Sequence, residues 1–224
     1  GIVNGLDMVA WNPATDQALV ERFSINNLST RNRNKHALLD TLALSLYPEL
    51  PLLIFISRMD NQKGIDLVLE ALQQIIHVPW NVILLGTGNP ELMRACQEFQ
   101  SAYPDRVRAE LRFDANLARQ MYAGGDMLLM PSRYEPCGLA QMIAMRYGCI
   151  PIARATGGLK DTIIDHADSQ HSTGFLFEDA SGKALADTII RAMGIYQDQS
   201  AWKGIQYRGM LTDFSWQNSA IKYA

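Results

Sequence analysis

The sequence predicts an α/β domain built on a doubly wound, mostly parallel, Rossmann-like sheet. From residue 51 onward, six short apolar runs alternate with stretches whose apolar residues recur at helical spacing. Strands that alternate with helices are typical of parallel sheets with right-handed crossovers and helices on both faces. With 224 residues, 48% of them hydrophobic, the chain is long enough to bury such a core.

The six expected strands are apolar runs that end in polar or turn-forming residues. Short runs bounded in this way are typical of strands buried on both faces. The strands are expected at residues 51–58, 81–86, 107–113, 127–132, 149–154 and 174–178.

The helices between these strands are indicated by spacing and by end signals. Apolar residues from 65 to 76 recur at helical intervals, and Pro90 suits the first turn of a helix. The glycine pair at 124–125 marks where the next helix ends. Residues 141–148 form another helical pattern, and residues 185–196 form an amphipathic one.

The first fifty residues begin with a turn-rich, extended stretch. A helix is expected around residues 30–44, with Ser29 or Thr30 as its cap. This segment contains a small basic cluster, which we expect to be a solvated helix face. The cluster consists of Arg31, Arg33, Lys35 and His36.

Composition argues against several classes of protein. The formal net charge is −3, whereas nucleic-acid-binding domains usually carry a basic excess. No apolar run approaches the roughly 20 residues needed to cross a membrane. The cysteines Cys96, Cys137 and Cys149 lack CxxC spacing, and no His/Cys/Asp cluster has the spacing of metal ligands. We therefore expect no nucleic-acid, membrane or metal partner.

The most informative stretch is SRYEPCGLAQ at residues 132–141, which joins an expected strand to an expected helix. N–H groups at a helix N-terminus lack intrahelical partners and can bind a phosphate or a sugar hydroxyl. Gly138 would let a ligand approach the backbone. The ionised carboxylate of Glu135 only accepts hydrogen bonds, so we expect it to hold neutral hydroxyls. The alternative is that Glu135 merely caps the following helix.

Two cations flank the loop after the first strand. Arg58 offers a planar fork and Lys63 a mobile point charge, so both can converge on one anion at the carboxyl end of the strand. Ligands of doubly wound sheets bind at this edge. Cations there would stabilise the charge that develops as a diphosphate departs. As isolated loop residues, they would simply be solvated.

A second glycine-containing turn follows the fifth expected strand. Thr156, Gly157 and Gly158 precede a helix and either admit a ligand or form a plain tight turn. The turn at 86–88 also follows a strand, but it lacks the spacing GxGxxG of dinucleotide-binding proteins. It would at best line a nucleotide pocket, and an NAD-dependent dehydrogenase is disfavoured.

Together, these motifs resemble the C-terminal domain of glycogen and starch synthases, which are retaining glucosyltransferases of the GT-B fold that use ADP-glucose. The resemblance covers nearly the whole chain, and the motifs occur in family order. They are GIVNGLD at 1–7, WNPATD at 11–16, SRMDNQKG at 57–64, SRYEPCGLAQ at 132–141, RATGGLKDT at 154–162 and DFSW at 213–216.

The resemblance implies a role for each motif. Arg58 and Lys63 would bind the donor phosphates and Glu135 the transferred glucose, and these three form the expected catalytic set. Phe113, which ends an expected strand and would otherwise belong to the core, would stack on the adenine. The further donor-binding residues are expected to be Cys137, Gly138, Leu139, Thr156, Gly157 and Gly158.

Cys137 is expected to pack beside the sugar and not to act as a nucleophile, because no histidine lies near the motif. Many GT-B transferases carry a second glutamate eight residues after the first, but position 143 is Ile, which points to the glycogen synthase group. Ala140 stands where many relatives have a hydroxyl, so one hydrogen bond to phosphate would be absent. Neither a metal nor a cofactor is expected besides the substrate ADP-glucose.

The chain is expected to be one half of a GT-B enzyme. Residues 1–224 would form the donor-binding domain, with 1–16 as the interdomain junction. Residues 214–224 would be a tail that crosses back to an N-terminal acceptor domain absent from this chain. Without that domain, we expect the tail to be frayed or docked on a neighbouring molecule.

The expected reaction is transfer of glucose from ADP-glucose to the non-reducing end of an α-1,4-glucan, with retention. The chain alone would bind ADP or ADP-glucose weakly and lack turnover, because the α-glucan acceptor would be held by the absent domain. A bacterial cytoplasmic location is expected, with a plastid as the second. Two alternatives stay open: a GT-B transferase that uses UDP-glucose, and a non-catalytic nucleotide- or glucan-binding module.

Overall fold

The computed structural model describes residues 4–44 and 47–221 of the chain. In this part, six parallel strands form a single sheet in the order β3-β2-β1-β4-β5-β6. The predicted doubly wound, Rossmann-like sheet is therefore confirmed, and the strand order reverses between β1 and β4. The strands are β1 (Leu52–Ile56), β2 (Asn81–Leu85), β3 (Val107–Glu110), β4 (Met127–Met130), β5 (Ile150–Arg154) and β6 (Phe175–Phe177).

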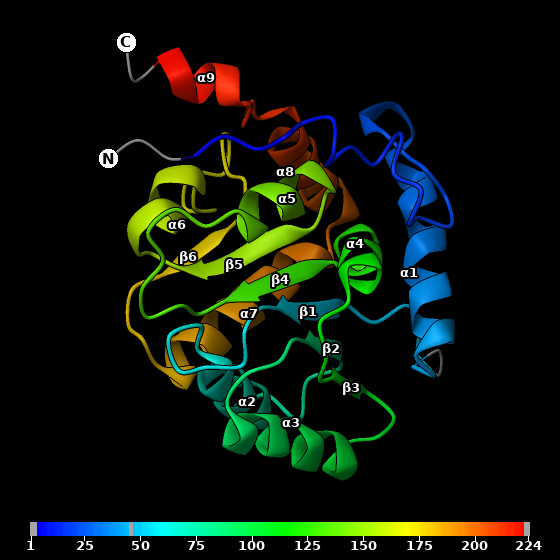
Figure 1. Cartoon of the computed structure of the whole chain (residues 1–224), viewed down its shortest axis with the longest axis vertical. Coiled ribbons are helices and arrows are strands. Elements are labelled where there is room, and N and C mark those ends of the chain that lie inside the picture. Colours follow the sequence, from blue (N-terminus) through cyan, green and yellow to red (C-terminus); the bar gives the residue numbers. More distant parts are fainter. Residues whose placement is uncertain (1–3, 45–46, 222–224) are drawn as a thin grey trace.

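Helices connect the strands and cover both faces of the sheet. Figure 1 shows α5 and α6 above the sheet and α2 and α3 below it. The helices are η1 (Ile25–Thr30), α1 (Arg31–Thr41), α2 (Ile65–Gln74), α3 (Pro90–Ala102), α4 (Ala115–Gly124), α5 (Ala140–Arg146), α6 (Gly157–Thr162), α7 (Gly182–Tyr196), α8 (Gln199–Leu211) and α9 (Trp216–Ile221).

Alternation along the central strands divides the core into two halves. In β1, Leu52 and Ile54 point to the face covered by α1, α4 and α5. Leu53 and Phe55 point to the opposite face, which is covered by α2, α3 and α7. Successive side chains of a strand alternate between faces, so one uninterrupted apolar run supplies both halves of the core.

The third strand is shorter than its sequence suggests. β3 ends at Glu110, so the prediction that Phe113 ends this strand is wrong. Asp114 accepts a hydrogen bond from the Leu117 N–H (2.9 Å) and so caps α4. This cap, together with an ion pair between Arg112 and Asp114 (3.1 Å), turns the chain before Phe113 could continue the strand.

A 3₁₀ helix, η1, leads directly into α1. Ser24 caps η1 by accepting a hydrogen bond from the Asn26 N–H (3.3 Å). Thr30 already has helical backbone angles, and its hydroxyl donates to the Asn27 carbonyl (2.9 Å). Thr30 therefore occupies the expected cap position of α1, but its side chain makes no capping hydrogen bond, because the chain is already helical there.

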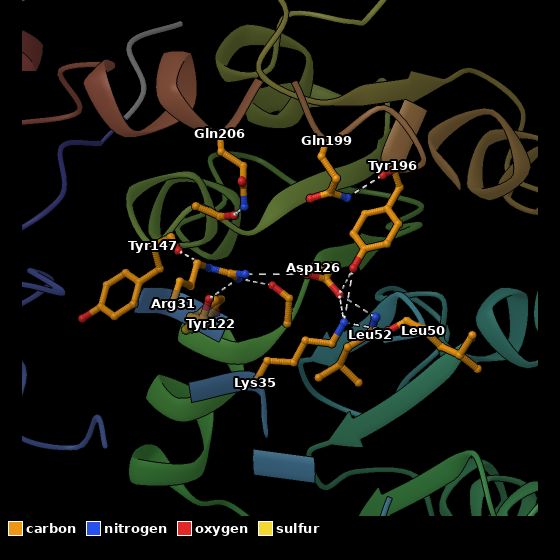
Figure 2. Close-up of polar contacts among 12 residues, drawn as sticks. Arg31, Lys35, Leu50, Leu52, Tyr122, Asp126, Tyr147, Tyr196, Gln199 and Gln206 are labelled. Atoms are coloured by element: carbon orange, nitrogen blue, oxygen red, sulfur yellow. Dashed lines mark hydrogen bonds and ion pairs between the residues drawn. The ribbon is translucent and has the colours of Figure 1, made fainter. Parts of the chain in front are cut away.

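The cluster expected to be a solvated face is in part buried. Arg31 and Lys35 are 3% and 4% exposed, and both face Asp126, which is 5% exposed. The Lys35 ammonium lies 2.8 Å from one carboxylate oxygen of Asp126, and Arg31 lies 3.7 Å from the other. The same carboxylate accepts hydrogen bonds from the Leu52 N–H (2.8 Å) and the Tyr196 hydroxyl (3.3 Å) (Figure 2).

Arg31 also holds the ends of two helices. Its guanidinium donates to the carbonyls of Tyr122 and Gly125 at the end of α4, and to that of Tyr147 after α5 (2.9 Å). Carbonyls at a helix C-terminus lack intrahelical partners and carry the negative end of the dipole. A buried cation at this place therefore stabilises both helix ends at once.

The start of the expected crossover tail pairs with the chain's own N-terminal segment. The Leu6 N–H donates to the Phe214 carbonyl (2.6 Å), and Leu6 and Ser215 form a parallel bridge. Gly5 lies directly against the backbone of Trp216. For residues 214–216 the expectation of a frayed or intermolecularly docked tail is therefore wrong. Residues 1–3 and 222–224 lie outside the described part.

The described helices and cysteines add two findings. Across residues 4–44 and 47–221, no helix combines the length and the apolar character needed to cross a membrane. The three cysteines are free thiols. Burial raises the pKa of Cys96 and of Cys149 to about 12, so neither is a reactive thiolate near neutral pH.

Replacing Asp126 by alanine should destabilise the fold strongly. The substitution leaves Lys35 and Arg31 buried without their carboxylate. Removing one partner of a buried ion pair lowers the free energy of unfolding by about 3–5 kcal/mol. Chemical denaturation of Asp126→Ala beside the unmodified chain would measure this loss.

The matched control is Lys183→Ala. Lys183 forms a helical ion pair with Asp187 (2.6 Å), but both side chains are largely exposed. Such pairs stabilise by only about 0.3–0.5 kcal/mol. If Asp126→Ala lost no more stability than this control, the buried network would not anchor the fold.

Candidate functional site

Two adjoining cavities open at the carboxyl edge of the sheet, beside the point where the strand order reverses. The larger has a volume of about 470 Å³ and the smaller one of about 60 Å³. Both are lined by Ile56 and Ser57 at the end of β1 and by Leu139 and Ala140 at the start of α5. Doubly wound sheets bind their ligands at this kind of switch point.

The larger cavity is mostly apolar. Its walls come from the loops after β1, β2 and β3, from α4 and from the N-terminal segment. Phe113 lines it with 87% of its surface exposed, and Arg58 and Leu139 also contribute. The turn at 86–88 reaches it through Gly86 and Thr87, as expected of a turn that lines a pocket.

Trp11 is a lining residue to which the sequence assigned no role. The Arg119 guanidinium lies 4.1 Å from the centre of its ring. Arg119 is held in turn by the buried Asp16 (2.8 Å), which also accepts a hydrogen bond from the Tyr147 hydroxyl (2.6 Å). The signal for this arrangement was the WNPATD stretch, which contains both Trp11 and Asp16.

Asp16 is an ionised group in this arrangement. Burial alone would raise the pKa of its carboxyl, but hydrogen bonds from Tyr147, the Ala18 N–H and Arg119 outweigh it and hold the pKa below its usual value. The charge of Arg119 is therefore balanced, and Trp11 sits against a fixed ion pair at the cavity wall.

The smaller cavity contains a buried ion pair. The Lys63 ammonium lies 2.5 Å from a carboxylate oxygen of Glu135, and the Ser132 hydroxyl donates to the same oxygen (3.2 Å). Glu135 is 6% exposed, and Gly138 completes the same wall. Since the residue that precedes the first turn of α5 is Leu139, Glu135 does not cap this helix.

Arg58 and Lys63 do not meet at one point in this structure. Arg58 lies on the larger cavity, 64% exposed, and pairs with Asp60 (2.8 Å). Lys63 lies on the smaller cavity and pairs with Glu135. Each cation thus already has its own carboxylate, and an incoming anion would share it or displace that partner.

Hydrogen bonds connect the loop that carries these cations to the loop after β4. The Arg133 N–H donates to the Gln62 carbonyl (2.8 Å), and the Gln62 amide donates to the Tyr134 carbonyl (3.2 Å). Arg133 also forms an ion pair with Asp66 in the first turn of α2 (2.7 Å). These contacts place Lys63 against Glu135, although 72 positions separate the two in the chain.

The turn with Thr156, Gly157 and Gly158 packs against the Glu135 loop. A Cβ atom on Gly157 would lie 2.1 Å from the Glu135 carbonyl oxygen, and one on Gly158 would lie 2.0 Å from that of Cys137. The Gly158 N–H donates to the Glu135 carbonyl (3.1 Å). These glycines therefore permit the close approach of the chain's own backbone at residues 135–137, and not that of a ligand.

The predicted donor-binding residues therefore divide into two groups. Phe113, Gly138 and Leu139 line the cavities, together with the expected catalytic residues. The others are not among the lining residues of either cavity: Cys137, Thr156, Gly157 and Gly158. Of these, Gly157 and Gly158 pack against the backbone of the Glu135 loop. In the described ranges, no cluster of three or more His, Cys, Asp or Glu side chains is arranged to hold a metal ion.

Comparison with known proteins places this geometry in a family. The chain is 44% identical over its whole length to a glycogen synthase from Geotalea daltonii and 45% identical to one from Anaeromyxobacter sp.. It spans about half the length of these relatives, 46% and 47% respectively.

Among solved structures, the chain is similar to the catalytic domain of Starch Synthase IV from Arabidopsis thaliana bound to ADP and acarbose. The TM-score is 0.93 at 39% identity, and the match covers all of this chain and 47% of that one. A family model described as "Glycosyl transferases group 1" matches residues 43–205, which is more than half of the chain. The chain therefore belongs to the glycosyl transferases group 1 family, and its sheet is the Rossmann-like half of a GT-B fold.

Proposed function

We propose that this chain is the donor-binding domain of an enzyme of the glycogen and starch synthase type. The enzyme would transfer glucose from ADP-glucose to the non-reducing end of an α-1,4-glucan, with retention. The observation that carries the proposal is the pair of adjoining cavities, one large and apolar, the other small and polar with a carboxylate at its wall. The glycogen synthases and the ADP-bound starch synthase that the chain resembles support it.

The larger cavity suits a nucleoside. Its volume of about 470 Å³ falls in the range of small-molecule sites, and such sites are mostly apolar with few polar groups. An aromatic side chain can stack on a base, and Phe113 has an exposed ring at the cavity. We therefore assign the base to this cavity, with Phe113 as its stacking partner.

The two cations suit the diphosphate. Lys63 has three N–H donors, so it can keep its bond to Glu135 and still donate to a phosphate oxygen. Arg58, on the adjoining cavity, would reach the same diphosphate from the nucleoside side. Both cations would stabilise the negative charge that develops when the nucleotide leaves.

Glu135 suits the sugar. One of its oxygens is held by Lys63 and Ser132, which fixes the plane of the carboxylate. The remaining acceptor positions can take sugar hydroxyls. Attack by a glucan hydroxyl requires that it be held against the donor carbon. We assign that task to the half that the relatives have beyond this chain, so the chain alone would lack turnover.

We expect the reaction to need no metal and no further cofactor, and the protein to work in the cytoplasm of a bacterium. Two alternatives differ from this proposal. A transferase specific for UDP-glucose would bind uridine nucleotides in preference to adenine nucleotides. A binding module without turnover would bind nucleotide or glucan but release no ADP in the full-length protein.

The chain should bind ADP more tightly than UDP. A purine covers more of the apolar wall and of the Phe113 ring than a pyrimidine does, and we expect about a tenfold difference, roughly 1.4 kcal/mol. Calorimetric titration of both nucleotides would measure it. A clear preference for UDP would favour the first alternative.

Arg58→Ala should weaken ADP binding by about tenfold to a hundredfold, because a charge-assisted hydrogen bond contributes roughly 1.5–3 kcal/mol. Lys63→Ala should lose at least as much, since it also leaves the buried Glu135 carboxylate uncompensated near the phosphates. Lys183→Ala, remote from both cavities, is the control. Wild-type ADP affinity in both variants would remove these cations from the site.

Glu135→Ala should impair turnover in the full-length protein much more than it impairs ADP binding. The proposed contacts of Glu135 are to the sugar, and loss of one such contact in the transition state costs on the order of a hundredfold in kcat. Turnover at saturating donor would be compared with the affinity for ADP. Ser132→Ala, which only removes one support of the carboxylate, should be milder. Near-normal turnover in Glu135→Ala would assign this residue a structural role.

A further inference from the structure

Gln141 lies next to the residues that line the smaller cavity, and it has no part in the proposed chemistry. It belongs to the first turn of α5, and its side chain is fully buried at 0% exposure. Its amide nitrogen donates to the carbonyls of Cys137 (3.1 Å) and Gly138 (3.1 Å). These carbonyls belong to the loop that carries Glu135.

The two hydrogen bonds fix the direction of two neighbouring N–H groups. A trans peptide unit is planar, so its N–H points away from its own C=O. Because the Cys137 and Gly138 carbonyls face Gln141, the N–H groups of Gly138 and Leu139 face away from it. Gly138 and Leu139 both line the smaller cavity, where these donors can meet an anionic oxygen.

The same amide reaches the second loop at the site. Its nitrogen lies 3.0 Å from the Thr162 hydroxyl, which donates to the Gly158 carbonyl in α6 (2.6 Å). The Gly158 N–H in turn donates to the Glu135 carbonyl. Gln141 thus joins the loop after β4 to helix α6 through one buried group.

Stability alone does not explain an amide at this position. The Gln141 side-chain oxygen is buried and has no hydrogen-bond partner among the described residues. It lies so close to Gly138 that a Cβ there would come within 2.4 Å of it. A buried acceptor without a partner is destabilising. The presence of an amide here is therefore better explained by the need to hold the Cys137 and Gly138 carbonyls in place.

We propose that Gln141 is a positioning residue that aims the Gly138 and Leu139 N–H groups at the phosphates of the bound nucleotide. The inference rests on the proposed function, because it takes the ligand to be a nucleoside diphosphate. Gln141 acts through the loop and does not touch the ligand. Its loss therefore weakens binding of the phosphates and leaves binding of the nucleoside unchanged.

The test compares ADP with adenosine, which lacks the phosphates. In Gln141→Met, which keeps the length of the side chain without its donors, ADP affinity should fall about tenfold while adenosine affinity stays within twofold. In the ligand-free chain, the amide resonances of Gly138 and Leu139 should shift in nuclear magnetic resonance spectra. Equal losses for both ligands would indicate general loosening and overturn the proposal, as would unchanged affinity for ADP.

Two further variants distinguish the contact of Gln141 with α6 from its hydrogen bonds to the Cys137 and Gly138 carbonyls. Thr162→Val removes the contact of Gln141 with α6 and the Thr162 bond to the Gly158 carbonyl, but it keeps both bonds from Gln141 to the Glu135 loop, so it should bind ADP within twofold of the unmodified chain. Gln141→Glu can donate one hydrogen bond when protonated, and burial beside two carbonyls raises the pKa of a carboxyl. Its ADP affinity relative to adenosine should therefore fall as the pH rises. Absence of this pH dependence, or a tenfold loss in Thr162→Val, would contradict the proposed role.

The outcomes also separate this inference from the proposed function. If the unmodified chain bound neither ADP nor adenosine, the proposed function would fail. The amide resonances of Gly138 and Leu139 would still show whether Gln141 sets the loop, because that measurement needs no ligand.

Discussion

The buried carboxylate of Asp126 ties together elements from both faces of the sheet. It lies at the start of β4, and it accepts hydrogen bonds from the first residue of β1, from Lys35 in α1 and from Tyr196 in α7. Helices from both faces of the sheet are therefore tied to one point. Arg31, held at the same carboxylate, binds the carbonyl ends of α4 and α5. The opposite ends of these two helices border the larger cavity, so the site depends on an anchor at the far edge of the sheet.

The site itself is formed by loops that pack backbone against backbone. The loop after β1 is hydrogen-bonded to the loop after β4, and that loop is in contact with the turn after β5. Such packing requires glycine where two backbone segments lie in direct contact, because a Cβ atom would clash with the neighbouring carbonyl oxygen. Gly157 and Gly158 are two such positions. Three loops from distant parts of the sequence thereby form one continuous wall at the carboxyl edge of the sheet.

The fold could be predicted from the sequence because alternation and spacing are local properties, and all six strands lie within their expected ranges. The motifs likewise brought Lys63 and Glu135 to one cavity, since both follow strands that are neighbours in the sheet. The burial of Arg31 and Lys35 could not be predicted. Their partner Asp126 is more than ninety positions away from Lys35, and it belongs to none of the recognised motifs. In addition, α1 shows no clear apolar stripe that would indicate which of its side chains are buried. Trp11 was missed for the same reason, because its contact with Arg119 joins distant segments of the chain. The bonds of Gln141 are local, to carbonyls three and four positions earlier, but no spacing pattern marks a buried side-chain amide as a support for a loop.

The ion pair between Lys63 and Glu135 affects the selectivity of the smaller cavity for small molecules. The two charges cancel locally, so the cavity does not present a bare cation to the abundant simple anions of a cell. Free phosphate would gain a contact with Lys63 but would also meet repulsion from the adjacent Glu135 carboxylate. A ligand that carries a diphosphate and a hydroxylated ring side by side offers an acceptor to the cation and donors to the carboxylate at once. Under the proposed function, the ion pair would favour a ligand that carries both groups over one that offers a phosphate alone.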